Sequence, residues 1–215
     1  MKALGMIEVY SFSTALCTAD TMAKAADVKV IAFDRNRPIR TDVPAPLVME
    51  VKIEGATSAV EAAIAAGKAY AEKEGKYIVS HIIAHPDDQT EKMAYLLDLN
   101  KDKFNKKMKK GVSPKPDPNA KTGAIGFCEV EGLVAAICGL DAMLKAAAVN
   151  VIHTEKRLGG RLVTFVVMGQ VSSVKAAVEA GCTEASKTGK IFGCEVIANP
   201  HEEIMKYFDT SIIDS

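Results

Sequence analysis

The chain contains the same sequence pattern twice. The segment ALGMIEVYSFSTALCTADTMAKAADVKVIAFDR, which starts at Ala3, aligns without a gap with AIGFCEVEGLVAAICGLDAMLKAAAVNVIHTEK, which starts at Ala124, an offset of 121 residues. From Gly55 and Gly169 onward the alignment resumes at an offset of 114 residues, so the first copy carries seven extra residues before Gly55. A period of about 120 residues is too long for one unit of a solenoid. The sequence therefore predicts one whole domain that occurs twice.

Chain length and composition agree with this duplication. The 215 residues, 48% of them hydrophobic, are enough for two domains of about 100 residues, each with its own core. Between the copies lies DLNKDKFNKKMKKGVSPKPDPNAKT, which is rich in Lys, then in Pro, and nearly free of apolar residues after Phe104. Such a composition is typical of a solvated linker. We therefore expect a first domain at residues 1–97, a linker at 98–122 and a second domain at 123–215.

Each copy has the pattern of four strands and two long helices. Short apolar runs predict the strands, and apolar residues at helical spacing predict the helices. Their order, β-α-β-β-α-β followed by a tail helix, is the ferredoxin-like plan. The predicted fold class is therefore α+β, with two such domains in tandem. In the first copy the strands are expected at 3–9, 28–34, 47–55 and 77–84, and the helices at 12–28 and 58–75.

The predicted helices carry start and stop signals. Ser13 or Thr14 is expected to cap the first helix, and Ser58 the second, which ends near Gly75. Pro86 is expected to start the short tail helix. Small-molecule sensors, trimeric signalling proteins and RNA-binding modules share this plan, so the fold alone does not decide the function.

The charge balance argues against nucleic-acid and membrane partners. Lys+Arg and Asp+Glu both number 27, and the strands lack the aromatic pair of an RNA-binding sheet. No apolar run approaches the ~20 residues of a membrane helix, and no secretory signal is present. Five cysteines, none in a CxxC pair, indicate reduced and mostly buried thiols. We expect a cytoplasmic chain.

No pattern of an enzyme is present. The four histidines form no HExxH motif, and the sequence has neither GxSxG nor a P-loop. Glu8 and Glu129 recur at equivalent positions in apolar strands, where structural pairing is the expected role. We therefore predict no catalytic residue and no enzymatic activity.

Several motifs resemble the shell domain of bacterial microcompartments. They are GMIEV and GFCEV, ADTMAKAADV and LDAMLKAAAV, TEKRLGGRLVTFVVMGQVSSVKAAVEAG, and VIANPHEEI and IIAHPDDQT. The resemblance covers both copies and leaves out only the linker. Two unpermuted domains in one chain imply a tandem-domain structural shell protein. The family implies a homotrimer that mimics a hexagonal tile of the shell facet, with other shell proteins at its edges.

The resemblance also implies which residues lie at the tile edges. The family's edge lysine corresponds to Lys24 and Lys145, whose alternative is an ordinary exposed helix lysine. The family's edge arginine is replaced by His85 and Asn199, and only His201 keeps the histidine after proline. We expect edge contacts that are weaker or tuned for mixed tiles.

The loop after the second strand lines a central pore in this family. Residues 34–42 carry a net charge of +1 and residues 155–161 of +2, so three copies place +9 around one axis. A pore that favours anionic small metabolites follows, unless the arginines pair with acidic neighbours. Neither loop contains Cys, so no iron–sulfur cluster, other metal or cofactor is expected. The expected pore-lining residues are Arg37, Pro38, Ile39, Arg40, Arg157, Leu158, Gly159, Gly160 and Arg161.

A regulatory sensor built from paired ferredoxin-like domains is the alternative function. It would bind a small molecule in a pocket between the domains. The glycines of the predicted pore loops have no role in such a sensor.

Overall fold

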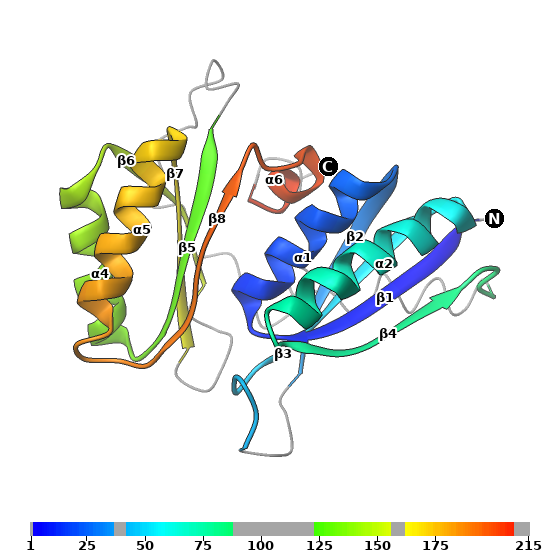
Figure 1. Ribbon diagram of the computed structural model, residues 1–215, viewed down its shortest axis with the longest axis horizontal. Helices are drawn as coiled ribbons and strands as arrows, with labels where there is room; N and C mark the ends of the chain where they lie inside the picture. The colour runs from blue at the N-terminus through cyan, green and yellow to red at the C-terminus, as the bar shows by residue number, and fades with distance from the viewer. Residues whose placement is uncertain (1, 37–41, 88–122, 156–161, 209–215) are drawn as a thin grey trace, which may run out of the picture. The chain divides into compact units, whose positions relative to one another are not determined.

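The computed structural model describes residues 2–36, 42–87, 123–155 and 162–208. These residues form two compact units (Figure 1). The first unit contains the described residues up to 87 together with His201–Tyr207, and the second contains those from 123 to Pro200 together with Phe208. No helix in the described part of the chain has the length and apolar character needed to cross a membrane.

The first unit is one antiparallel sheet with two helices on one face (Figure 1). Its strand order is β2-β3-β1-β4. Met49, Val51 and Ile53, at alternate positions of one strand, are fully buried, as the two-residue period of a strand requires. The elements are β1 (Ala3–Tyr10), α1 (Phe12–Ala25), β2 (Val28–Asn36), β3 (Val48–Gly55), α2 (Thr57–Lys73) and β4 (Tyr77–Ile83).

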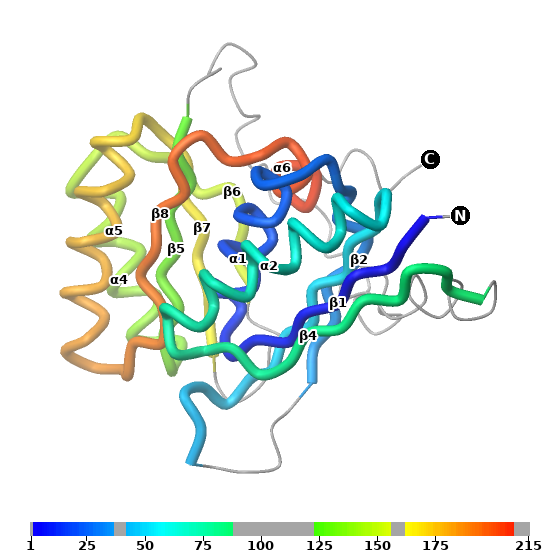
Figure 2. Tube along the Cα trace, turned by 45° about the vertical axis from the view of Figure 1, so that its right-hand side comes forward, coloured from blue at the N-terminus to red at the C-terminus, as the bar shows by residue number. Residues whose placement is uncertain are grey.

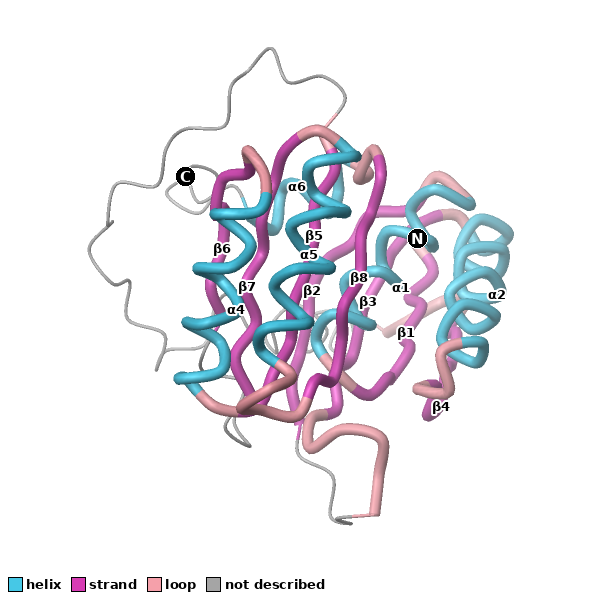
Figure 3. The backbone as a smooth tube through the Cα atoms, turned by 60° about the vertical axis from the view of Figure 1, so that its left-hand side comes forward, coloured by secondary structure: helices cyan, strands magenta, loops and turns pink. Residues whose placement is uncertain are grey.

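The second unit repeats this arrangement. Its strand order is β6-β7-β5-β8, again antiparallel, and its two helices lie on one face of the sheet (Figure 3). Val130, Val167 and Val174 belong to the core between sheet and helices. The elements are β5 (Ala124–Glu131), α4 (Leu133–Ala146), β6 (Val149–Glu155), β7 (Leu162–Gly169), α5 (Val171–Ala185) and β8 (Ile191–Ala198). The last described helix, α6 (Glu202–Phe208), follows β8 in the sequence, but its residues up to Tyr207 belong to the first unit.

The duplication extends to irregularities of the sheets. The ladder between β1 and β4 shifts register between Glu8 and Val9, and the ladder between β5 and β8 shifts at the equivalent Glu129 and Val130. Strand order, connections and bulges therefore agree, and the predicted α+β fold of two tandem ferredoxin-like domains is confirmed.

Close helix packing explains why one glycine recurs. A Cβ atom on Gly67 would lie 2.6 Å from Cγ of Met22, and one on Gly181 would lie 2.4 Å from Cγ of Met143. Any larger residue would push the two helices of a unit apart. The sequence alignment pairs these residues because both units pack their helices in the same way.

The predicted helix caps are wrong. α1 starts at Phe12 after Ser11, and α2 starts after Ala56, in both cases without a capping hydrogen bond from a described side chain. The hydroxyl of Ser13 instead lies 2.9 Å from that of Ser11. Ser11 has φ 80°, and the equivalent Gly132 has φ 96°. The chain therefore turns from strand to helix through a left-handed backbone at both sites, without a cap.

The tail helix predicted after the second copy is present, and its segment belongs to the first unit (Figure 2). The ring of Tyr207 lies 5.9 Å from that of Phe12 and 5.0 Å from that of Phe33, centre to centre. The backbone N–H of Val30 donates to the carboxylate of Glu203 at 3.0 Å. The linker and the tail predicted after Pro86 lie outside the described residues, which stop at 87 before resuming at 123.

Candidate assembly surface

The first helices of the two units differ in burial. In α1, eleven of fourteen residues are buried, whereas in α4 only four of fourteen are. A helix on a two-layer domain normally buries one face. α4 therefore shows the burial of an ordinary outer helix, and α1 that of a helix covered on more than one side.

α4 exposes a row of large apolar side chains. Leu133, Val134, Ile137 and Leu144 are 56%, 70%, 55% and 46% exposed. The spacing from Leu133 to Ile137 and on to Leu144 is helical, so these side chains share one outward stripe. A clustered apolar surface of this kind marks an interaction site more often than scattered single residues do.

On α1 the segment His201–Tyr207 of the same unit contacts Phe12, which corresponds to Leu133 of the stripe, and Asp20. The backbone N–H of His201 donates to the Asp20 carboxylate at 2.8 Å. That carboxylate also accepts from Lys24 at 2.6 Å, and its side chain is only 7% exposed. Together with the contact between Tyr207 and Phe12, these interactions fix the segment on the helix.

The equivalent carboxylate on α4 has no such cover. Asp141 pairs with Lys145 at 2.6 Å, as Asp20 pairs with Lys24, but its side chain is 59% exposed. The hydrogen bond from Lys145 to this carboxylate raises the pKa of the lysine. The pair between Asp141 and Lys145 is thus conserved between the units, and the covering segment is found on one of them in the described part of the chain.

The residues predicted at the tile edges are all described. Lys24 and Lys145 lie in the last turns of α1 and α4 and pair with Asp20 and Asp141. His85 and Asn199 are exposed and follow β4 and β8. His201 caps α6, because its Nδ1 accepts the N–H of Glu203 at 3.2 Å. Their role at a tile edge stays a prediction.

The predicted pore residues lie outside the described part of the chain. They fall in residues 37–41 and 156–161, between β2 and β3 and between β6 and β7. The two connections are equivalent. The last residues of the longer first connection, just before β3, pack against the rest of the first unit. Ala45 and Leu47 are fully buried there, and the carbonyl of Leu47 accepts from the backbone N–H of Ser11 at 3.0 Å.

A buried lysine lies next to the first of these connections. Lys52, 3% exposed, has its ammonium 3.8 Å from the Asp34 carboxylate and 3.5 Å from that of Glu50. Burial raises the pKa of Glu50, and the nearby carboxylates of Glu8 and Asp34 act in the same direction. The positive charge of Lys52 is therefore compensated inside the sheet by the carboxylates of Asp34 and Glu50.

The apolar stripe of α4 was not predicted from the sequence. A signal was present, since LVAAICGL replaces the more polar FSTALCTA of the first copy. Apolar residues on every side of a helix predict burial, and the two first helices were expected to be equivalent.

A disulfide in the second unit was not predicted either. Cys182 and Cys194 are joined, contrary to the expectation of reduced thiols, because α5 and β8 bring these residues together.

Both copies of the duplicated sequence match the same family of known proteins. The BMC domain family matches residues 3–86 and again 124–200, more than half of the chain. The chain belongs to this family, as a structural bacterial microcompartment shell protein with two BMC domains in tandem.

Its relatives are themselves proteins of such compartments. The chain is 32% identical over 203 residues to the carboxysome assembly protein CcmO of Synechococcus elongatus, with 94% of this chain and 67% of the relative covered. It is 42% identical over 89 residues to the bacterial microcompartment shell protein PduA of Salmonella typhimurium, with 41% of this chain and 94% of the relative covered. A crystal structure of a microcompartment protein from Desulfitobacterium hafniense covers 96% of this chain and 99% of its own, at 23% identity and a TM-score of 0.38.

Proposed function

We propose that three copies of the chain close into a ring of six BMC domains, which forms a tile of the microcompartment shell. The observation that carries this proposal is the exposed apolar stripe of α4, whose counterpart on α1 is covered. In a ring, each copy supplies to its neighbour a cover for α4, which the second unit does not have among the described residues of its own chain.

The segment that follows β4 is the proposed cover of α4. Pro86 and Asp87 align with Pro200 and His201, and the segment from His201 covers α1. We assign the equivalent residues, Pro86 and Asp87, to the α4 surface of a second copy. The N–H of Asp87 would then take the place at Asp141 that His201 takes at Asp20.

Burial of the stripe provides the free energy of closure. Covering a large apolar side chain is worth about 1.5–3 kcal/mol when it is complete, and these side chains are about half exposed. Four of them give several kcal/mol at each of the three contacts of a ring. This is enough to offset a substantial part of the cost of association, and the rest falls to the surrounding polar contacts.

The tile would have edges and a pore. Lys24 and Lys145 are proposed to meet other shell proteins at the edges, together with His85, Asn199 and His201. The pore would be lined by the two loops, whose net charges of +1 and +2 favour small anionic metabolites. The role is structural and transporting, without chemistry on the transported molecules.

Electron microscopy of the purified protein tests the ring. We expect single particles with threefold symmetry, six lobes and a central opening, and flat hexagonal sheets at high protein concentration. Particles without threefold symmetry would rule out the ring. A monomer that instead binds amino acids or nucleotides in calorimetry would favour the sensor.

Anion flux tests the pore separately. Replacing Arg37, Arg40, Arg157 and Arg161 by Gln removes the charge from tiles reconstituted in a planar layer. We expect a lower flux of anions and an unchanged flux of neutral solutes of the same size. Equal anion flux in both proteins would end the proposal for the pore and leave the ring untouched.

A further inference from the structure

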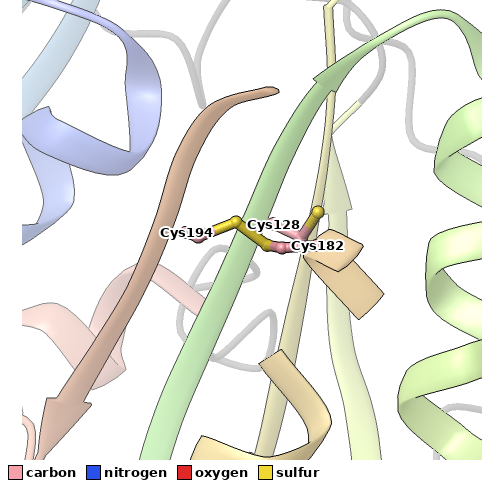
Figure 4. Close-up of side chains that lie close together, drawn as sticks. All are labelled: Cys128, Cys182 and Cys194. Carbon is pink, nitrogen blue, oxygen red and sulfur yellow. A yellow bond between two sulfur atoms is a disulfide. The ribbon is translucent and has the colours of Figure 1, made fainter. Parts of the chain in front are cut away.

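Three cysteines from three elements of the second unit meet at one point. Cys128 lies in the middle of β5, and Cys194 is its direct partner on β8. Opposed residues of an antiparallel pair point to the same face of the sheet, and α5 places Cys182 over this face. The three sulfur atoms all lie within 4.8 Å of one another (Figure 4).

Two of these sulfurs form a disulfide and the third stays a thiol. The Cα atoms of Cys182 and Cys194 are 6.4 Å apart, within the usual range for a disulfide. Cys128 is free and only 2% exposed. Burial, and to a lesser extent the charge of Glu129, raise the pKa of the Cys128 thiol to about 12.

Reduction turns this group into a set of three ligands. A dithiol reductant breaks the bond between the sulfurs, leaves an S–H on each, and is itself oxidised to a disulfide. Three sulfurs then face a common centre. Zn–S bonds of about 2.3 Å at tetrahedral angles place the sulfurs about 3.8 Å apart. The three sulfurs lie within 4.8 Å of one another, so that side-chain rotation after reduction has only a short way to bring them to this spacing.

Burial of Cys128 does not oppose a metal ion. An ion displaces the thiol protons to solvent, and its positive charge reverses the effect of the apolar surroundings on the sulfur. Cys194 is exposed on the edge strand β8, which leaves the fourth coordination position open to water. The described residues contribute no fourth Cys, His or carboxylate to the group.

The first unit shows that the fold does not require sulfur here. Ile7, Lys68 and Ser80 occupy the positions that correspond to the three cysteines. Ile7 is fully buried in the core, Lys68 lies near Glu72, and the Ser80 hydroxyl is 3.0 Å from that of Tyr77. The same backbone therefore carries three ordinary residues in one unit and three converging thiols in the other.

We propose that the second domain, in its reduced form, binds one Zn²⁺ ion through the thiolates of Cys128, Cys182 and Cys194, and that the disulfide form does not bind it. This site differs from the pore loops, which contain no Cys. It does not depend on the ring, because all three ligands come from one unit of one chain.

Cobalt binding tests the site in the full-length chain. The protein is reduced with a phosphine under anaerobic conditions, and Co²⁺ is titrated in as a spectroscopic probe. We expect sulfur-to-cobalt charge-transfer absorption that saturates at one Co²⁺ per chain and disappears on addition of Zn²⁺. Protein that keeps its disulfide should lack the absorption.

Two variants assign the ligands without loss of the fold. Cys194→Ser changes an exposed residue, and Cys128→Ile installs the core residue of the first unit; both should abolish the absorption. Cys138→Ser, in α4, is the matched control and should keep it. Absence of the absorption in reduced wild-type protein, or its persistence in Cys194→Ser, would overturn the proposal. Light scattering on the same samples keeps this result separate from the fate of the ring.

Discussion

The two units share their four strands, their two long helices and their sheet bulges, and they differ in how their first helices are covered. α1 carries the segment His201–Tyr207, which binds its Asp20, whereas α4 exposes both its Asp141 and an apolar stripe. The helix with the more apolar outer face is thus the more exposed one. A duplicated fold gives two equivalent surfaces, and the difference between them is the basis of the proposal that a second copy of the chain binds at α4.

The largest expected effect comes from charging the α4 stripe. Val134→Glu or Ile137→Glu should weaken association at least a hundredfold, or about 3 kcal/mol per contact, because the carboxylate must be desolvated on binding. The folded monomer should tolerate both changes, since both side chains are more than half exposed. Sedimentation velocity measures the loss of the trimer. Ala176→Glu, on the exposed face of α5, is the control, and equal association of all three variants would contradict the account.

Reduction of the disulfide should destabilise the second unit selectively. Cys182 and Cys194 are twelve residues apart, and closing a loop of this length is worth up to about 3 kcal/mol in the unfolded chain. Urea unfolding with and without a phosphine, in the presence of a metal chelator, measures the difference. The first unit, which has no cysteine at the corresponding positions, is the internal reference. Identical unfolding curves would show that the disulfide contributes nothing.

Removing the charge of the first-helix carboxylate should affect the units unequally. Asp20→Asn weakens two charge-assisted hydrogen bonds of a nearly buried group and should cost about 2 kcal/mol. Asp141→Asn should change the stability of the monomer little, because its pair with Lys145 is exposed. Both are to be compared in a Val134→Glu background by chemical denaturation. In the trimer Asp141→Asn should gain an effect, and an effect that is the same in monomer and trimer would remove Asp141 from the contact.

The smallest expected effect is at the turn before the first helices. Gly132→Ser places a side chain at φ 96° and should destabilise the second unit by about 1 kcal/mol. Ser11→Gly relieves the same strain at φ 80° but removes the hydroxyl contact with Ser13, so the gain should be smaller. Thermal unfolding measures both. A stabilising Gly132→Ser would mean that the two turns are not equivalent.

The fold could be predicted from the sequence because the duplication shows the apolar pattern of each helix and strand twice. Gly67 and Met22 align with Gly181 and Met143 for the same packing reason. Apolar periodicity placed all eight described strands, and the motif GMIEV and its partners indicated the family that was then found. The starts of the helices were harder to predict. In the sequence, a serine with a left-handed backbone such as Ser11 looks the same as a serine that caps a helix.

Contacts between distant segments could not be predicted from the sequence. The position of His201–Tyr207 on α1 depends on the hydrogen bond between His201 and Asp20, which are 181 residues apart. No local sequence pattern predicts this contact. The convergence of three cysteines likewise needs the register of β5 with β8, which apolar patterns do not fix to one residue. The tile-edge and pore predictions came from resemblance, and they stay predictions.

Molar mass in solution tests the central claim most directly. Size-exclusion chromatography with light scattering, over a range of concentrations from the low micromolar upward, should give three times the 22.9 kDa mass of the chain. A constant mass of one chain at every concentration would mean that the α4 stripe is not covered by a second copy, and the ring would have to be abandoned.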